Sequence, residues 1–490
     1  MNPESYHGGW STLELIISFA IFTITFASII VLVAQAQDAT VTMERSREAL
    51  RIAEAKLDAL RAQGRASFDD VVSEEAAPEE YGGVSYTTEI IVSDISVCAK
   101  RAQARVSWET DTGRKGKVNL ETVFAYSQAS FALGADCSIL SPRGNWNSPR
   151  TLATVPVSSG RALSLDALNS FAYLGTDSPP YLEIIDARDP QSPSPISLPP
   201  TFTAEYPVNS IDVVRQDNRT IAYLARESTT SQFAVLDVTD PFAPALIATR
   251  TLAGVDPLGG EPGGNRVSFF EDTVFMTTRN TAGPEFHVFS VQTPESPSEF
   301  LAAMRNLNLT VTDMAFSEYE EESDPRIIGF FTAKANTREL LVYDVTDSTN
   351  PIEVRTIDFP GIQDGGSVFA LGKNLYVGRQ FTSDNIEFFV FQTSELIDSA
   401  ASPAPLTKEL SGSVRAIRGS EDILFFGLTQ PPTRKLQVWP LERAVLDAVT
   451  EPIGYLNISS IRAQGMDYED NVLYAINDSG GTLWIIGPQS

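Results

Sequence analysis

Histidine and cysteine are both scarce in this chain of 490 residues, with two copies of each. With His7 and His287 alone, the chain cannot combine a Ser-His-Asp or Cys-His site with a multi-histidine zinc site. Much hydrolytic and metal-dependent chemistry is therefore excluded, and we expect neither a metal nor another cofactor. His287 lies in the apolar run EFHVFSV, which predicts a strand residue rather than a catalytic base.

Positive charge is also in short supply: 36 Lys and Arg residues stand against 63 Asp and Glu residues, and the net charge is −27. Because phosphate contacts require clusters of Lys and Arg, nucleic acid is not expected as a ligand of the bulk surface. The acidic run at 318–324 lacks the alternating spacing of a calcium loop. The glycine-rich run at 256–265 lacks the Lys-Ser/Thr pair of a phosphate-binding loop. We expect two exposed loops here, and no group of residues indicates an enzyme.

One long stretch lacks charge almost entirely. From Leu15 to Gln37 no residue is charged, and Glu14 stands directly before this stretch. About 20 apolar residues at ~1.5 Å per residue match a hydrocarbon core of roughly 30 Å, which predicts a transmembrane segment at about 15–37. The helical pattern continues to Gln63, and Gly64 is typical of a helix end, so one helix is expected over 10–65. A cleaved secretory signal fits poorly, because the leader contains no Lys or Arg.

The start of the chain resembles the leader of type IV prepilins. A short polar segment (1–9) ends in Gly9, and Trp10 is followed by a small hydroxylated pair, an aliphatic residue and Glu14. The resemblance implies cleavage after Gly9 by prepilin peptidase, methylation of the Trp10 amine and retention of the apolar segment. It also implies that Glu14 meets the Trp10 amine of a neighbouring subunit during filament assembly, because a lone carboxylate in hydrocarbon is costly.

Residues 66–127 predict a small domain with an antiparallel sheet. An acidic segment, EEAAPEE, precedes three β-rich runs: GVSYTTEIIVSDI, CAKRAQARVSWE and GKVNLETVF. Together with the helix end KLDALRA, the hairpin of the last two runs resembles minor pilins and the minor pseudopilins of type II secretion, particularly the I subunit. A generic membrane protein with one span and an α+β domain is the alternative.

A linker of small and polar residues at 128–148 follows this domain. It contains Cys137, whereas Cys98 lies at the start of the second β-rich run. Both cysteines lie beyond the apolar segment, on the side expected to be exported into an oxidising compartment. A disulfide between them is favoured over two free buried thiols.

Internal repeats occupy residues 149–490. A strand of the form aliphatic-x-aliphatic-aliphatic-Asp ends in Asp186, Asp237 and Asp344, and the same position recurs in four weaker copies. The spacing of 47 to 54 residues suits four-stranded blades. The segment 150–157 resembles an outer strand missing from the last copy, so we expect it to close a ring of seven blades. The three aspartates are expected to bond their own turns. The copies resemble LVIVD-repeat β-propellers.

We therefore expect a multi-domain protein: a long N-terminal transmembrane helix with a small α+β pilin domain, then an all-β seven-bladed propeller. The expected function is that of a minor pilin or pseudopilin that displays the propeller for adhesion or partner recognition, at the filament tip. Expected partners are other pilin subunits, prepilin peptidase, the inner-membrane assembly platform and a surface ligand of the propeller. The cell membrane before assembly and an extracellular filament afterwards are the expected locations. A membrane-tethered propeller enzyme resembling a lyase or glycosidase, and a membrane-anchored scaffold outside any filament, are the alternatives.

Overall fold

The computed structural model divides the chain into two compact units. The first ends at Phe124 and the second begins at Ala125, except that the short segment Ile95–Ala99 groups with the second. The structure describes residues 12–66, 71, 73–75, 78–81, 84–96, 99–109, 115–125, 145–216, 219–255, 263–279, 283–321, 324–380, 386–398, 402–410, 412–420, 423–429, 433–441 and 443–489. For some of these, Glu14 among them, the backbone alone is described.

The first unit combines one long helix with a five-stranded sheet. Helix α1 (Thr12–Ala66) is 55 residues long. The strands are β1 (Glu74–Glu75), β2 (Glu79–Tyr81), β3 (Val84–Ser96), β4 (Ala99–Glu109) and β5 (Lys115–Ala125). Their order is β1-β3-β4-β5, with β2 also paired to β3. The acidic segment EEAAPEE therefore contributes the two short strands β1 and β2.

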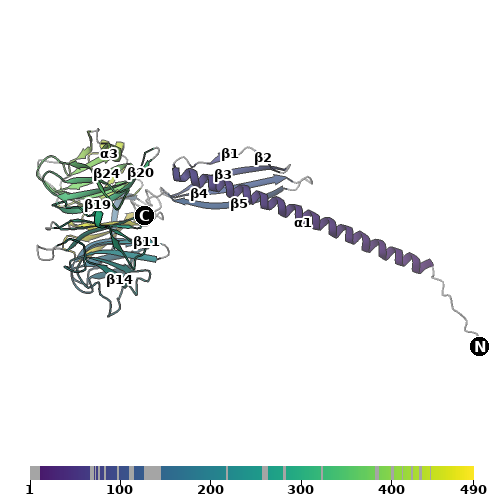
Figure 1. Ribbon diagram of the computed structural model, residues 1–490, viewed down its shortest axis with the longest axis horizontal. Helices are drawn as coiled ribbons and strands as arrows, with labels where there is room; N and C mark the ends of the chain where they lie inside the picture. The colour runs from purple at the N-terminus through teal and green to yellow at the C-terminus, as the bar shows by residue number, and fades with distance from the viewer. Residues whose placement is uncertain are drawn as a thin grey trace, which may run out of the picture. The chain divides into compact units, whose positions relative to one another are not determined.

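The second half of α1 lies along this sheet (Figure 1). Apolar side chains recur on one side of the helix and are at most 5% exposed: Ala49, Ile52, Ala53, Leu57 and Leu60. Alternate residues of β3 and β4 are buried as well: Tyr86, Thr88, Ile90, Ala102, Ala104, Val106 and Trp108. The apolar side chains of the helix recur with a period of 3.6 and those of the strands with a period of 2. The helix and the sheet therefore each contribute one face of a small core. Leu50 is 39% exposed, because Ala49 takes the inward position beside it.

The first half of α1 is apolar and uncovered. Large side chains there are 50% to 69% exposed: Ile16, Ile17, Phe19, Ile21, Phe22, Ile24, Phe26, Ile29, Ile30 and Leu32. Within the residues that the structure describes, no helix is both long and apolar enough to cross a membrane. The predicted transmembrane segment therefore has no support from the structure.

The second unit is a propeller, as the repeats predict. Its described residues form seven four-stranded antiparallel sheets, numbered here as blades in chain order. Blades 1 to 3 comprise β7 (Ala162–Leu168), β8 (Phe171–Thr176), β9 (Leu182–Asp186) and β10 (Ser194–Pro195); β11 (Val208–Gln216), β12 (Arg219–Arg226), β13 (Phe233–Asp237) and β14 (Ala245–Arg250); and β15 (Gly264–Phe270), β16 (Thr273–Thr278), β17 (Phe286–Ser290) and β18 (Ser298–Glu299).

The later blades follow the same order. They comprise β19 (Thr310–Glu321), β20 (Asp324–Lys334), β21 (Leu340–Asp344) and β22 (Ile352–Ile357); β23 (Gly365–Leu371), β24 (Asn374–Arg379), β25 (Phe388–Gln392) and β26 (Leu406–Lys408); β27 (Val414–Ser420), β28 (Ile423–Leu428), β29 (Leu436–Pro440) and β30 (Gly454–Leu456); and β31 (Ile461–Glu469), β32 (Val472–Asn477), β33 (Thr482–Gln489) and β6 (Asn145–Pro156). Short helical turns η1 (Leu301–Ala303), α3 (Thr393–Ile397) and α4 (Arg443–Ala448) lie between strands.

The ring closes on itself. The first strand of each blade contacts the first strand of the next, in the series β7, β11, β15, β19, β23, β27, β31 and again β7. Strand β6, from the start of the propeller, pairs with the last strand, β33, from Thr482 opposite Pro156 to Gln489 opposite Asn145. This pairing leaves blade 7 with a complete outer edge.

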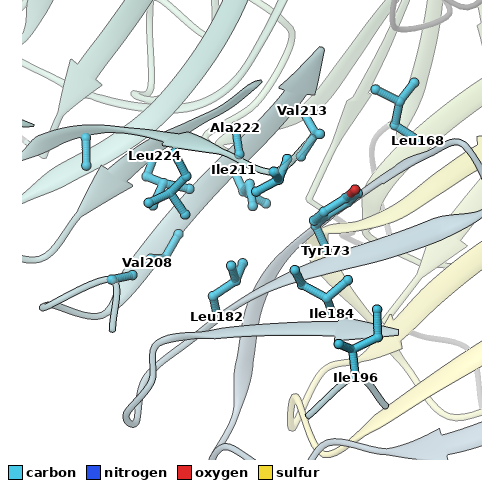
Figure 2. Packing of buried hydrophobic residues seen from close by; sticks show 14 residues of the cluster. Leu168, Tyr173, Leu182, Ile184, Ile196, Val208, Ile211, Val213, Ala222 and Leu224 are labelled. Atoms are coloured by element: carbon cyan, nitrogen blue, oxygen red, sulfur yellow. The ribbon is translucent and has the colours of Figure 1, made fainter. Parts of the chain in front are cut away.

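Packing between blades supplies the core. Between blades 1 and 2, aliphatic side chains from the two sheets interlock (Figure 2): Leu182, Ile184, Val208, Ile211, Val213, Ala222 and Leu224. The third strands, such as LEIID and FAVLD, are buried on both faces up to their last residue. Each blade therefore packs on two neighbours, which explains why these strands read as continuous apolar runs.

The hairpin of β19 and β20 corrects a second loop prediction. The acidic run at 318–324 pairs in register from Glu318 opposite Ile327 to Glu321 opposite Asp324, with residues 322 and 323 outside the described part. The acidic run therefore lengthens strands β19 and β20, because its backbone groups form hydrogen bonds between the two strands.

Trp146 is the strongest anchor of the closing strand, and its loss should destabilise the propeller. Its ring is 4% exposed and lies 4.8 Å from the ring of Phe425, and its Nε1 donates to Asn471 Oδ1 at 2.9 Å. Trp146→Ala should cost about 3–5 kcal/mol of propeller stability. Trp146→Phe, which keeps an aromatic ring, should lose substantially less. Calorimetric melting of the two variants tests this, and an Ala variant as stable as wild type would contradict it.

Candidate functional site

Several residues predicted to be functional lie outside the described part of the chain. Gly9, Trp10, Cys98 and Cys137 are among these, and so is the side chain of Glu14, whose backbone belongs to α1. Prepilin processing, the role of Glu14 and the disulfide therefore stay predictions.

The three repeat aspartates lie in outer turns on different blades. The Oδ1 atoms of Asp186, Asp237 and Asp344 each accept a hydrogen bond from the backbone N–H two residues on, at 3.1, 2.9 and 3.0 Å. A hydrogen bond from the Arg188 side chain lowers the pKa of Asp186. These contacts stabilise turns, and the structure does not bring the three carboxylates together.

His287 is fully buried in β17. Its Nδ1 lies 2.6 Å from Glu299 Oε1 and its Nε2 lies 2.9 Å from the carbonyl oxygen of Pro284. Both ring nitrogens are therefore engaged inside blade 3, as expected of a strand residue with a structural role.

A different set of carboxylates gathers at the propeller axis. Asp166, Asp212, Asp313 and Asp467 lie on first strands of blades 1, 2, 4 and 7, and they line a cavity of about 150 Å³ together with Arg418 of blade 6. Sequence analysis missed this group, because its members lie in different repeats. The signal available was the pattern Ser-x-Asp in SLDAL and SIDVV. Among the described residues, no group of His, Cys, Asp and Glu side chains has the arrangement of a metal site.

Each of these carboxylates also links two blades. Asp212 Oδ2 accepts the N–H of Phe269 at 2.6 Å, and Asp166 Oδ2 accepts the N–H of Val213. The N–H groups of Val368 and Ala167 donate in the same way to the remaining two, Asp313 at 3.1 Å and Asp467 at 2.9 Å. The aspartates therefore bridge four of the seven contacts between adjacent first strands.

Burial and mutual repulsion separate the proton affinities of the group. Burial, followed by the charges of Asp467 and Asp212, raises the pKa of Asp166 well above its ordinary value. Burial also raises the pKa of Asp212 to about 6. Arg418 Nε donates to Asp467 Oδ1 at 3.1 Å, so a cation lies directly beside this group of carboxyls. Asp166, whose burial favours the protonated form, therefore lies beside a second carboxyl that accepts from Arg418, and two carboxyls in such different surroundings suit acid–base chemistry.

Gln464 closes the axis on one side of this cavity. Between Ile461 and Met466 the register of β31 against β32 shifts, and Gln464 adopts a positive φ of 55°. Its Nε2 donates to Asp313 Oδ1 at 3.3 Å, from blade 7 to blade 4. Its Oε1 is buried and accepts no hydrogen bond from the described residues. A non-glycine residue at positive φ is costly, so this crossing contact rests on strained backbone.

A second set of buried polar side chains is structural. In blades 2 to 5 the side chain before the third strand accepts the backbone N–H of the segment that leads to the next blade: Gln232 from Leu252, Glu285 from Leu307, Glu339 from Phe359 and Glu387 from Leu410. These residues fasten the inter-blade connections, so we place them outside the candidate site.

Comparison with known proteins gives distant structural similarities only. No protein-family model and no curated protein sequence matches the chain. Similar solved structures include the dihydro-heme d1 dehydrogenase NirN, at 11% identity and a TM-score of 0.39, over 79% of this chain and 67% of that one. A Trypanosoma rangeli sialidase mutant with trans-sialidase activity gives 11% and 0.31, over 86% and 88%. An exo-β-1,3-galactanase of Phanerochaete chrysosporium gives 10% and 0.31, over 56% and 65%.

These neighbours are propeller-type folds, and they correct one prediction. The expectation that the chain is not an enzyme is wrong as an exclusion, because its structural neighbours are themselves enzymes. The scarcity of histidine removes histidine-dependent sites only, whereas carboxylates alone support acid–base chemistry. At these identities and TM-scores the likeness concerns the fold and carries no argument about a reaction.

The raised pKa of Asp212 predicts a pH-dependent cost. Asp212→Asn keeps an oxygen that accepts the N–H of Phe269 and removes the ionisable group. Between pH 4 and about 6 the unfolded wild-type chain releases this proton while the folded protein retains it. The free energy of unfolding of the variant, relative to wild type, should therefore rise with pH by up to about 3 kcal/mol.

Denaturant titrations at pH 4 and pH 7.5 measure this difference. Asp186→Asn is the control, because the pKa of Asp186 is lowered and its titration lies below this pH range. Its stability relative to wild type should therefore stay nearly constant between the two pH values. A difference for Asp212→Asn that stays constant with pH would refute the assignment.

Proposed function

We propose that this chain is a pilin-like subunit that displays the propeller from a filament of the type IV class. The observation that carries the proposal is the uncovered apolar half of α1. A single helix with large apolar side chains exposed on all sides is not stable in water, so lipid or other helices must cover it. In the proposal, lipid covers it before assembly and the helices of neighbouring subunits cover it in the filament.

The hydroxyl-bearing side chains in this half of α1 are compatible with apolar surroundings. The hydroxyls of Thr25 and Ser28 each donate to the carbonyl oxygen four residues earlier, at 2.8 Å, and Thr23 does the same at 2.5 Å. These hydroxyl groups are therefore satisfied within the helix and do not require water. The second half of α1 already has its sheet, so it can project the exported domains without a further partner.

The sequence at the N-terminus supplies the remaining parts of the proposal. Cleavage after Gly9 would free the amine of Trp10 beside the uncharged segment, and Glu14 would pair with that amine on a neighbouring subunit. Such a pair compensates a carboxylate that would otherwise be costly in an apolar surrounding. Prepilin peptidase and the inner-membrane platform would be the partners of these steps.

The propeller is the displayed module. It takes up most of the chain, and one such domain on every subunit would crowd a filament built from this protein alone. We therefore place the protein at low copy number at the filament tip, where the propeller meets partners or surfaces. Immunogold labelling spread along the shaft would contradict the tip assignment.

Processing of the N-terminus tests the proposal most directly. Mass spectrometry of the protein purified from its own membranes should show a chain that begins with methylated Trp10. Glu14→Ala should be processed normally and yet be absent from sheared filaments, because it removes the pairing group only. An intact chain from Met1, with wild-type and Glu14→Ala protein equally membrane-bound, would support an anchored scaffold instead.

A propeller enzyme is the second candidate, and the axial carboxylates favour it. The pair formed by Asp166 and Asp467 combines a carboxyl whose pKa is raised by burial with one that accepts from Arg418, in a cavity large enough for a group of about the size of benzene. Glycoside cleavage or elimination by a lyase would use such a pair as general acid and base.

Turnover of a panel of glycosides and acidic polysaccharides tests this candidate. Asp166→Asn should reduce any turnover by about 10²-fold or more, because it removes the proton while keeping an acceptor for Val213. Asp186→Asn, in an outer turn, is the matched control and should leave the rate unchanged. Equal rates for wild type and Asp166→Asn would remove the pair from catalysis.

A further inference from the structure

A second opening lies on the other side of the contact between Gln464 and Asp313. Thr312 and Ala463, the residues directly before these two, line an opening of about 650 Å³, whereas Asp313 and Gln464 line the acidic cavity. The contact therefore separates two compartments on one axis.

The larger opening is basic, although the chain as a whole is acidic. Six cationic side chains line it, against three carboxylates: Arg161, Arg266, Arg279, Lys334, Arg415 and Arg462. In the complete sequence, acidic residues outnumber basic ones by 63 to 36. We name this set of six the basic funnel.

The order of strands explains the convergence. Arg161, Arg266, Arg415 and Arg462 lie at the starts of first strands, and Arg279 and Lys334 lie at the ends of second strands. In an antiparallel pair these two ends share one side, so blades 1, 3, 4, 6 and 7 each contribute a cation to the same mouth. Asn145, where the described propeller begins, lies at the opposite end of β6 from Pro156, which leads to Arg161. The funnel therefore opens on the face away from that start.

Part of this positive charge is not compensated within the propeller. Arg161 pairs with Asp177 at 2.7 Å and Arg279 with Glu227 at 3.1 Å. Arg266 donates to the carbonyl oxygens of Thr312 and Asn265, and Arg462 to those of Leu163 and Asp478. Lys334 and Arg415 have no ion pair with any residue that the structure describes, and Arg415 Nε is buried without a partner there.

The cations also repel one another. Burial lowers the pKa of Arg266 to about 10, Asp313 opposes this change, and the charges of Arg279 and Arg462 add to it. Burial and then the charge of Arg161 contribute to the lowered pKa of Arg462, against the opposing charge of Asp478. An anion placed among these groups would relieve the repulsion. The acidic outer surface would not prevent this, because charges beyond about 8 Å are largely screened at physiological ionic strength.

We propose that the basic funnel binds the end of an acidic oligosaccharide through two or more carboxylate or sulfate groups. Arginine forks bind such groups in a bidentate manner. The volume of about 650 Å³ suits a compact ligand. The described lining contains no aromatic side chain on which a nucleic-acid base could stack, and Asn209, Asn265, Thr310 and Thr312 supply neutral polar groups for hydroxyls.

This inference is independent of the filament proposal, because every residue of the funnel belongs to the propeller. The full-length protein in a neutral detergent is titrated by calorimetry with trigalacturonate, a heparin-derived tetrasaccharide, maltotriose and a tetra-aspartate peptide. We expect saturable binding of one or both acidic oligosaccharides at 50 mM NaCl, a marked weakening at 300 mM NaCl, and no binding of maltotriose.

Charge-neutralising variants locate the site. Arg415→Gln should weaken binding about tenfold, and Lys334→Gln should weaken it severalfold, because each removes a cation that has no ion pair within the described propeller. Lys373→Gln is the matched control: Lys373 is exposed in the turn between β23 and β24, at the other end of the strands. It should leave the affinity unchanged, and all three variants should melt like wild type.

Four results would overturn the proposal. These are the absence of saturable binding of either acidic oligosaccharide at millimolar concentration, equal binding of maltotriose, tighter binding of the peptide than of the oligosaccharides, and an affinity that Arg415→Gln leaves intact while the variant remains folded.

Discussion

The propeller depends on one contact between distant parts of the chain, the pairing of β6 with β33. Without it, blade 7 would lack its outer strand and the ring would end in an open edge. Trp146 reinforces the pairing from inside, because its indole bonds Asn471, 325 residues away in sequence, and packs on Phe425 of the preceding blade. The axial aspartates add a second fastening, since each bonds the backbone of the following blade. The first completes blade 7 from both ends of the propeller sequence, and the second joins adjacent blades by hydrogen bonds.

The axis of this ring is electrically divided. On one side of the contact between Gln464 and Asp313 lie carboxylates, of which Asp166 and Asp212 have raised pKa values because burial disfavours their charge. On the other side lie cations, of which Arg266 has a lowered pKa for the same reason. The two groups line separate compartments, one on each side of this contact. The irregular segment of β31 makes this division, since a regular strand would not bring Gln464 to the axis.

Much of the fold could be predicted from the sequence, whereas the site could not. The strand LEIID and its copies recur at a nearly constant spacing. Strands such as LEIID and FAVLD are buried on both faces, so they consist of apolar residues and can be recognised in the sequence. Asp186, Asp237 and Asp344 are conspicuous in the sequence because they end those strands, and in the structure they stabilise turns. The axial aspartates occupy first strands whose sequences vary more, and only closure of the ring brings them together. Gln464 could not be predicted, because its position follows from a local loss of register.

The closing strand also sets an order of events in folding. The first unit joins α1 to strands that follow within a few dozen residues, so it can form as soon as these residues are available. The ring must wait for β33, because its outer partner β6 stands at the other end of the propeller sequence. Until then, seven incomplete or unclosed sheets expose apolar faces and a free edge, a state that is prone to wrong pairing. The first unit can therefore be complete while the propeller is still open, and the apolar faces of the blades need protection until the last strand has been synthesised.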